Sequence, residues 1–259
     1  MDTTVKNISQ AKSDLLLQIA SLLMTSGANT NRVLLILNKF SKLIKTDAEL
    51  FIDHKVFILS TKDSKEQPLL TQVKRLPKHT VNFDTISGLS RISYIAEKEE
   101  WTFDKIKDEV QNLTKVKVYS QWFKLLSVSL GGAGLCYIFD GDMISMLVTF
   151  VATFFGFFTK QYFDRHNFNP YLSAFFGALI AALLAASFYL VLPDFNPNIA
   201  VATAVLFIVP GVPLVNSFTD VMDGYYISGF VRFIHGLLYV FAIAFALFIV
   251  MYLFNIQNI

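Results

Sequence analysis

The chain has 259 residues, of which 54% are hydrophobic and 16% are charged, and its formal net charge at pH 7 is +2. Soluble globular domains carry about 25% charged residues, and nucleic-acid-binding proteins carry clustered basic residues that this chain lacks. The composition therefore argues against a single soluble domain, a disordered chain and a nucleic-acid partner.

Charge is concentrated in the first part of the chain. Residues 1–121 contain 18 of the 22 Lys and Arg residues and 14 of the 20 Asp and Glu residues, so residues 122–259 contain only 4 and 6. A polar part is thus joined to an apolar part. We predict an α-helical polytopic membrane protein, with an N-terminal cytoplasmic α+β domain at residues 1–118 and a transmembrane domain at residues 119–259.

The predicted cytoplasmic domain begins with two helices. An amphipathic pattern covers residues 9–24, Gly27 suits the left-handed end of that helix, and Asn29 or Thr30 can cap a second helix at residues 32–44. Three strand-like runs and two further helices follow, at residues 49–52, 56–60, 69–75, 84–97 and 102–118.

No motif for a cofactor or a catalytic centre occurs in this domain. Walker, GxGxxG, HExxH, CxxC and GxSxG patterns are all missing from the sequence, which argues against an ATP-driven pump, an enzyme, a metal site and a bound cofactor. The one cysteine, Cys136, cannot form an internal disulfide and fits a packed position in an apolar run.

Five apolar stretches in the second part each approach the ~20 residues that cross a bilayer. We predict five transmembrane helices at residues 122–139, 143–158, 171–192, 198–218 and 228–254. The lipid bilayer is therefore the first partner that the sequence implies.

The basic residues orient these predicted spans. Lys124, Lys160, Arg165 and Arg232 would all lie at one membrane face, whereas the connections at the opposite face contain no Lys or Arg. Because basic residues favour the cytoplasmic side, we expect the N-terminus in the cytoplasm and, after five spans, the C-terminus outside.

The third predicted span carries small residues along two adjacent lines. Those lines are Gly177, Ala181 and Ala185, and Ala178, Ala182 and Ala186. Small residues four positions apart let helix backbones approach closely in lipid. The neighbouring helix could belong to this chain, to a second copy or to another protein.

The fourth predicted span contains Pro210-Gly211-Val212-Pro213. Each proline removes a helical hydrogen bond, and inside a membrane the freed carbonyl groups must be covered by protein or line a wet cavity. Broken helices of this type occur at the substrate sites of transporters. A simple proline kink is the alternative.

Polar residues follow the prolines. Asn216 and Asp220 are four residues apart and share a helix face, and Ser228, Arg232 and His235 form a second stripe. Asp220 could bind an ammonium group and Arg232 a carboxylate, and Asp220 is also a candidate for proton coupling, because desolvation favours its neutral form. Alternatively, Arg232 reaches the membrane interface and Asp220 is solvated in a loop.

Two segments carry a family resemblance. Ser26-Gly27-Ala28-Asn29-Thr30-Asn31-Arg32-Val33 and Val209-Pro210-Gly211-Val212-Pro213-Leu214-Val215-Asn216, with Asp220 following, resemble the motifs of the threonine/serine exporter family. The resemblance covers nearly the whole chain. It implies a proton-coupled secondary exporter of threonine and serine in the cytoplasmic (inner) membrane of a prokaryote. Some relatives are associated instead with dicarboxylates such as succinate.

The resemblance carries over only the motif positions. These are Pro210, Gly211, Pro213, Asn216 and Asp220 on the predicted substrate and proton pathway, together with Gly27 and Arg32 in the soluble domain. We expect Arg32 to fix the two-helix opening by packing or by a salt bridge. Arg232 and His235 join the pathway from the residue pattern alone.

Full-length members of the family have a second membrane half, and this chain resembles the split form. The resemblance therefore implies a second, small membrane protein as partner, with a homo-oligomer as the alternative. We predict threonine or serine ahead of a dicarboxylate as substrate. The rival hypothesis is a structural or regulatory membrane subunit that transports nothing.

Overall fold

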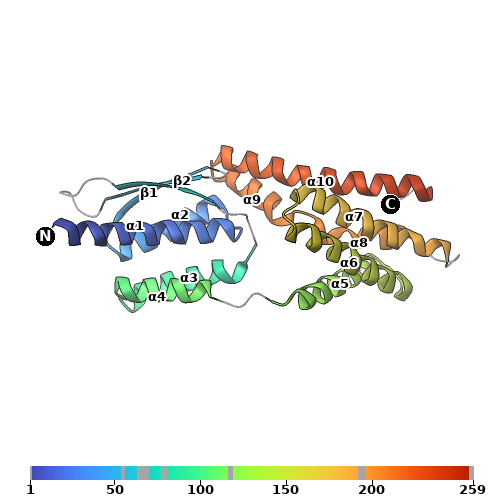
Figure 1. The fold of residues 1–259 in the computed structure, drawn as a ribbon, viewed down its shortest axis with the longest axis horizontal. Coiled ribbons are helices and arrows are strands. Elements are labelled where there is room, and N and C mark those ends of the chain that lie inside the picture. Colours follow the sequence, from blue (N-terminus) through green and yellow to red (C-terminus); the bar gives the residue numbers. More distant parts are fainter. Residues whose placement is uncertain are drawn as a thin grey trace. The chain divides into compact units, whose positions relative to one another are not determined.

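The computed structural model describes residues 2–53, 56–62, 70–76, 81–115, 119–191 and 197–256, which form two compact units (Figure 1). The first unit contains Met1–Lys117 and Val212–Phe233, and the second contains Val118–Gly211 and Ile234–Ile259. Residues 212–233 therefore pack with the polar part of the chain. Compactness does not decide which residues lie in lipid, so the domain boundaries at 1–118 and 119–259 stay predictions.

A three-stranded antiparallel sheet forms one layer of the first unit. Its strands are β1 (Asp47–Ile52), β2 (Val56–Lys62) and β3 (Leu70–Arg75), in the order β1-β2-β3. Alternate residues of β2 point inward, so Phe57 and Leu59 are buried while Ile58 is exposed. The three predicted strands are confirmed within two residues at each end.

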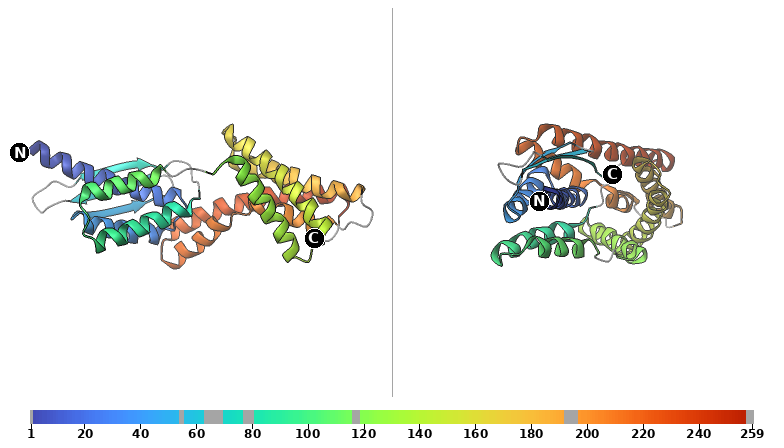
Figure 2. Two further views of the ribbon diagram at one scale, coloured as in Figure 1. Left: turned by 90° about the horizontal axis from the view of Figure 1, so that it is seen from below. Right: turned by 60° about the vertical axis from the view of Figure 1, so that its left-hand side comes forward.

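Four helices complete the first unit's α+β part. Helices α1 (Asp2–Thr25) and α2 (Thr30–Leu43) cover one face of the sheet, and α3 (Phe83–Lys98) and α4 (Phe103–Thr114) pack on the far side of α1 and α2, as Figures 1 and 2 show.

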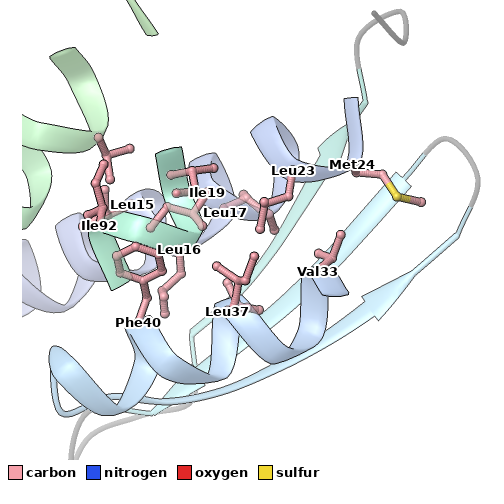
Figure 3. Close-up of a cluster of buried hydrophobic side chains, with 14 of the residues drawn as sticks. Leu15, Leu16, Leu17, Ile19, Leu23, Met24, Val33, Leu37, Phe40 and Ile92 are labelled. Atoms are coloured by element: carbon pink, nitrogen blue, oxygen red, sulfur yellow. The ribbon is translucent and has the colours of Figure 1, made fainter. Parts of the chain in front are cut away.

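The core of this part lies between its layers. Figure 3 shows Leu16, Ile19 and Leu23 of α1 facing Leu37 and Phe40 of α2, and all five side chains are fully buried. Their spacing of three and four residues places them on one face of each helix. This contiguous apolar core fixes the connection between α1 and α2, which carries the site described below.

The second unit is helical in its described residues. Its helices are α5 (Gln121–Ile138), α6 (Met143–Arg165), α7 (Pro170–Ser187), α8 (Pro197–Ala204) and most of α10 (Tyr226–Phe254). Single 3₁₀ turns follow α7 and α8, at Phe188–Leu190 and Leu206–Ile208. Helix α9 (Gly211–Met222) belongs to the first unit from Val212 onward. The first unit also includes α10 as far as Phe233.

Three helices of the described chain are long and apolar enough to cross a membrane. They are Met143–Arg165, Pro170–Leu190 and Tyr226–Phe254, and the broken pair Pro197–Ile208 and Gly211–Met222 is a fourth candidate. Helix α5 forms where the first span was predicted but does not join this set, because Gln121, Lys124 and its glycines and serines lower its hydropathy. The count of five spans stays a prediction.

The small residues of α7 pack against α6. All six residues of the two predicted lines are buried. A Cβ built on Gly156 of α6 would lie 2.6 Å from the Ala181 Cβ and 2.7 Å from the Gly177 carbonyl oxygen. The neighbour that the sequence left open is therefore a helix of this same chain.

Candidate functional site

The connection between α1 and α2 presents backbone groups to α9 and α10. Gly27 has φ +93°, a left-handed conformation that costs glycine little. The Gly27 N–H donates to the Met24 carbonyl at 3.1 Å and the Ala28 N–H to the Leu23 carbonyl at 3.0 Å, which ends α1. Asn29 then caps α2 by accepting the Arg32 N–H at 2.9 Å, so the first of the two predicted capping residues is the cap.

Asp220 of α9 is the buried centre of the site. Its side chain is 0% exposed. One carboxylate oxygen accepts the Thr30 N–H at 2.8 Å, and the other accepts the Thr30 hydroxyl at 3.0 Å and lies 3.1 Å from the Arg232 Nε. Because Thr30 is the first residue of α2, the partial positive charge of the helix N-terminus also favours this carboxylate.

Two further side chains hold the carbonyl groups of the same connection. The Arg232 Nη2 donates to the Ala28 carbonyl at 3.1 Å, and the Asn216 Nδ2 donates to the Gly27 carbonyl at 2.8 Å. We call the set Gly27, Ala28, Thr30, Asn216, Asp220 and Arg232 the Asp220 network. It joins the two motif segments of the sequence within the first unit.

The two buried charges of the network, on Asp220 and Arg232, compensate each other. A buried carboxylate is costly unless it is paired and hydrogen-bonded, and Asp220 meets both conditions. The Arg232 side chain is 11% exposed, so its charge is shielded from water as well. The arrangement can hold the two segments together, and its guanidinium has the planar donors that bind a carboxylate in two-point fashion.

The predicted break in the fourth apolar segment is present. Helix α8 ends at Ala204, a 3₁₀ turn follows, and α9 begins at Gly211. The Thr153 hydroxyl of α6 donates to the Ala204 carbonyl at 3.2 Å, so protein covers one of the carbonyl groups that the helix end leaves free. Pro213 lies in the first turn of α9, where its missing N–H is not needed.

Other predicted site residues lie elsewhere. Arg32 is exposed, and its guanidinium donates to the Ser90 hydroxyl at 3.4 Å, which ties α2 to α3. His235 contacts Tyr171 in the second unit. Pro210 and Gly211 fall at the boundary of that unit. The functional roles of all these residues stay predictions.

The residue pattern did not indicate that Thr30 contacts Asp220 or that Tyr171 contacts His235. The sequence indicates Thr30 only as a possible helix cap, and its place inside the 26–33 motif is the one sign of a further role. No motif in the sequence around Tyr171 indicates a functional role for it. Among the residues that the structure describes, no three His, Cys, Asp or Glu side chains gather to hold a metal ion.

The family model of the threonine/serine exporters, ThrE, matches residues 14–254. The chain belongs to the threonine/serine exporter family. The predicted resemblance is thereby confirmed over nearly the whole length, and both segments of the Asp220 network lie inside the match.

Individual relatives carry two kinds of name. Over 230 residues the chain is 25% identical to the "Probable succinate transporter subunit YjjP" of Klebsiella aerogenes, with 88% of each chain covered, and 25% identical to the Escherichia coli protein of that name, with 86% of this chain and 87% of that one covered. It is 21% identical to the "Probable threonine/serine exporter" of Mycobacterium tuberculosis, with 85% of this chain and 42% of that one covered. No solved structure matches the chain.

Gly27→Ala is expected to destabilise the exporter-family chain by about 1–2 kcal/mol, because a Cβ is disfavoured at a positive φ. The space itself is adequate, since the nearest atoms, from Val212 and Val81, lie 3.5 Å from the built Cβ. Thermal unfolding in mild detergent measures the effect. Gly211→Ala is the matched control, because nothing lies within 4 Å of its built Cβ. Equal melting temperatures for both variants would contradict the role given to Gly27.

Proposed function

We propose that this chain is the larger subunit of a secondary exporter of small carboxylate-bearing metabolites. The observation that carries the proposal is the buried Asp220–Arg232 pair on either side of the α9–α10 turn, with Asp220 in the second half of the broken apolar segment. Many secondary transporters bind their substrate at polar sites on broken helices, and alternating access needs such a site to exist in two arrangements. The Asp220 network would be the closed one of these two arrangements, in which Asp220 is paired with Arg232.

Arg232 is the proposed substrate-binding residue. In the structure its Nε pairs with the Asp220 carboxylate, and a substrate carboxylate offers the same chemistry. We propose that the substrate replaces Asp220 as the partner of Arg232. Asp220 would then keep its hydrogen bonds from the Thr30 N–H and hydroxyl. Without the ion pair, α9 would be free to shift relative to α10. Binding and opening are thereby linked, because a ligand shifts an equilibrium only through its differential contacts with the two states.

The substrate class follows from the same contacts. An α-amino acid needs a carboxylate partner for its ammonium group as well as Arg232, and Asp220 would serve once the pair opens. A dicarboxylate needs only cationic or neutral donors at its second end. Relatives that match this chain over most of their length are named as succinate transporter subunits, so we place succinate-like dicarboxylates beside threonine and serine as substrates.

Proton coupling and placement belong to the same proposal. We propose export driven by a proton gradient across the cytoplasmic membrane of a prokaryote, with the N-terminus in the cytoplasm, the C-terminus outside and five spans. The sequence support is the distribution of Lys and Arg and the membrane-length helices. A second, small membrane protein completes the transporter, as the word "subunit" in the relatives' names suggests.

Efflux from preloaded proteoliposomes tests this function. Labelled threonine, serine and succinate are compared with this chain alone, with its small partner alone and with both, in the presence and absence of a pH gradient. We expect efflux with both proteins, increased by the gradient. Efflux of the same size from vesicles with the partner alone would contradict an exporter role for this chain.

A structural subunit is the second candidate function, and one observation favours it. Both Asp220 oxygens and the Arg232 guanidinium already have partners, so the network is complete without a substrate. This function predicts that transport survives Arg232→Lys in protein that remains folded, whereas the exporter function predicts its loss.

A further inference from the structure

A second polar cluster lies between α7 and α10 in the second unit. The Tyr171 hydroxyl and the His235 Nδ1 are hydrogen-bonded, and their rings stack with centroids 6.1 Å apart. The ring of Tyr239, one helical turn beyond His235, packs edge-on against Tyr171 at 5.1 Å. Both helices belong to candidate membrane spans.

Helix α6, which packs against α7, and helix α10 also carry charged groups. On α6, Asp164 forms an ion pair of 2.6 Å with Lys160. On α10, Arg232 precedes His235 by three residues. An ionisable side chain within an apolar helix is costly and commonly marks an ion or proton path.

The Tyr–His hydrogen bond persists in both protonation states of the imidazole. With neutral His235 protonated at Nε2, the Tyr171 hydroxyl donates to Nδ1, and with the imidazolium, the Nδ1–H donates to the hydroxyl oxygen. A proton arriving at the hydroxyl oxygen can therefore displace the hydroxyl proton onto Nδ1, which regenerates the tyrosine and leaves a positively charged imidazole. The reverse transfer releases the proton.

We propose that His235, positioned by Tyr171, carries the coupled proton during export. The inference rests on the proposed function and goes beyond it, because the residue pattern pointed to Asp220 as the proton carrier. Both oxygens of Asp220 are held by Thr30 and Arg232, whereas the Tyr171–His235 pair can gain and lose a proton without losing its internal hydrogen bond.

His235→Gln and Tyr171→Phe test the proposal in proteoliposomes that contain both subunits. Efflux driven by a pH gradient is compared with substrate exchange at equal pH on both sides, which needs no net proton movement. We expect His235→Gln to abolish the stimulation by the gradient while exchange continues, and Tyr171→Phe to shift the pH at half-maximal stimulation. His166→Gln is the control, because His166 is exposed at the end of α6.

Each outcome has a separate meaning. Gradient-driven efflux by His235→Gln that equals the wild type would overturn the inference and leave the proposed function standing. Absence of any efflux by the wild-type pair of proteins would overturn the proposed function and the proton role with it. Loss of exchange together with gradient-driven efflux would also count against the inference, because a proton carrier is not required for exchange.

Hydrogen–deuterium exchange at the imidazole C2 position supplies a measurement that is independent of transport. Its rate as a function of pH, followed by mass spectrometry, reports the titration of each histidine in the intact protein. We expect the titration midpoint of His235 to move in Tyr171→Phe while that of His166 stays unchanged. An unchanged His235 midpoint would overturn the positioning role of Tyr171.

Discussion

Asp220→Ala is expected to lower the free energy of unfolding by about 3–5 kcal/mol, because it leaves the Arg232 charge shielded from water without its partner. It also removes the acceptor of the Thr30 N–H and hydroxyl. Thermal and denaturant unfolding in mild detergent measure the loss. Asp223→Ala is the matched control, since Asp223 is an exposed carboxylate three residues further along, and we expect its effect to stay within about 0.5 kcal/mol.

A double-mutant cycle separates the pair from its surroundings. Arg232→Ala leaves Asp220 with the Thr30 donors alone, and the double variant removes both charges. We expect the double variant to lose clearly less free energy of unfolding than the two single variants together. With both side chains removed, no unpaired buried charge remains. Additive losses would show that the 3.1 Å contact between Arg232 and Asp220 contributes nothing of its own.

Gly156→Val is expected to lower the free energy of unfolding by about 1–3 kcal/mol or more. The built Cβ alone lies 2.6 Å from the Ala181 Cβ and 2.7 Å from the Gly177 carbonyl oxygen, so α6 and α7 must separate. The lost packing cannot be replaced by lipid contacts of equal quality, because close backbone approach is the main attraction between such helices. Thermal unfolding and protease resistance of residues 119–256 measure the change.

Gly134→Ala provides the control for this prediction. Gly134 lies in α5, and nothing is found within 4 Å of its built Cβ. We expect no loss of stability there, and a small gain is consistent with the higher helix propensity of alanine. If the Gly156 variant melts at the same temperature as the Gly134 variant, the close packing of α6 on α7 is not a source of stability.

Local patterns predicted local structure well. The turn at Gly27, the cap at Asn29 and the break at Pro210, between Ile208 and Gly211, depend on a few neighbouring residues with strong backbone preferences. The six small residues of α7 were read as a packing face for the same reason, because their spacing alone places them together. Hydropathy located the long helices, but α5 falls short of a membrane span because its polar and glycine residues dilute its apolar ones.

Contacts between distant segments could not be predicted from spacing. Asp220 and Arg232 were identified as complementary charges for a zwitterion, yet in the structure they neutralise each other. Thr30, 190 residues before Asp220, donates both of its hydrogen bonds from a helix end whose position depends on the apolar core of the first unit. The partner of His235 lies 64 residues away on another helix, and its identity depends on how α7 and α10 pack.

The central claim is that Arg232 exchanges Asp220 for a substrate carboxylate, and efflux by Arg232→Lys tests it most directly. Lysine keeps the positive charge but not the planar fork that binds a carboxylate at two points. With both subunits in proteoliposomes, we expect efflux of labelled succinate or threonine to fall to the level of empty vesicles while thermal unfolding still shows a folded protein. We expect Asp220→Asn, a weaker competitor for Arg232, to lower the half-saturating concentration of succinate, which does not use Asp220 as a partner. Wild-type efflux by folded Arg232→Lys would contradict the claim.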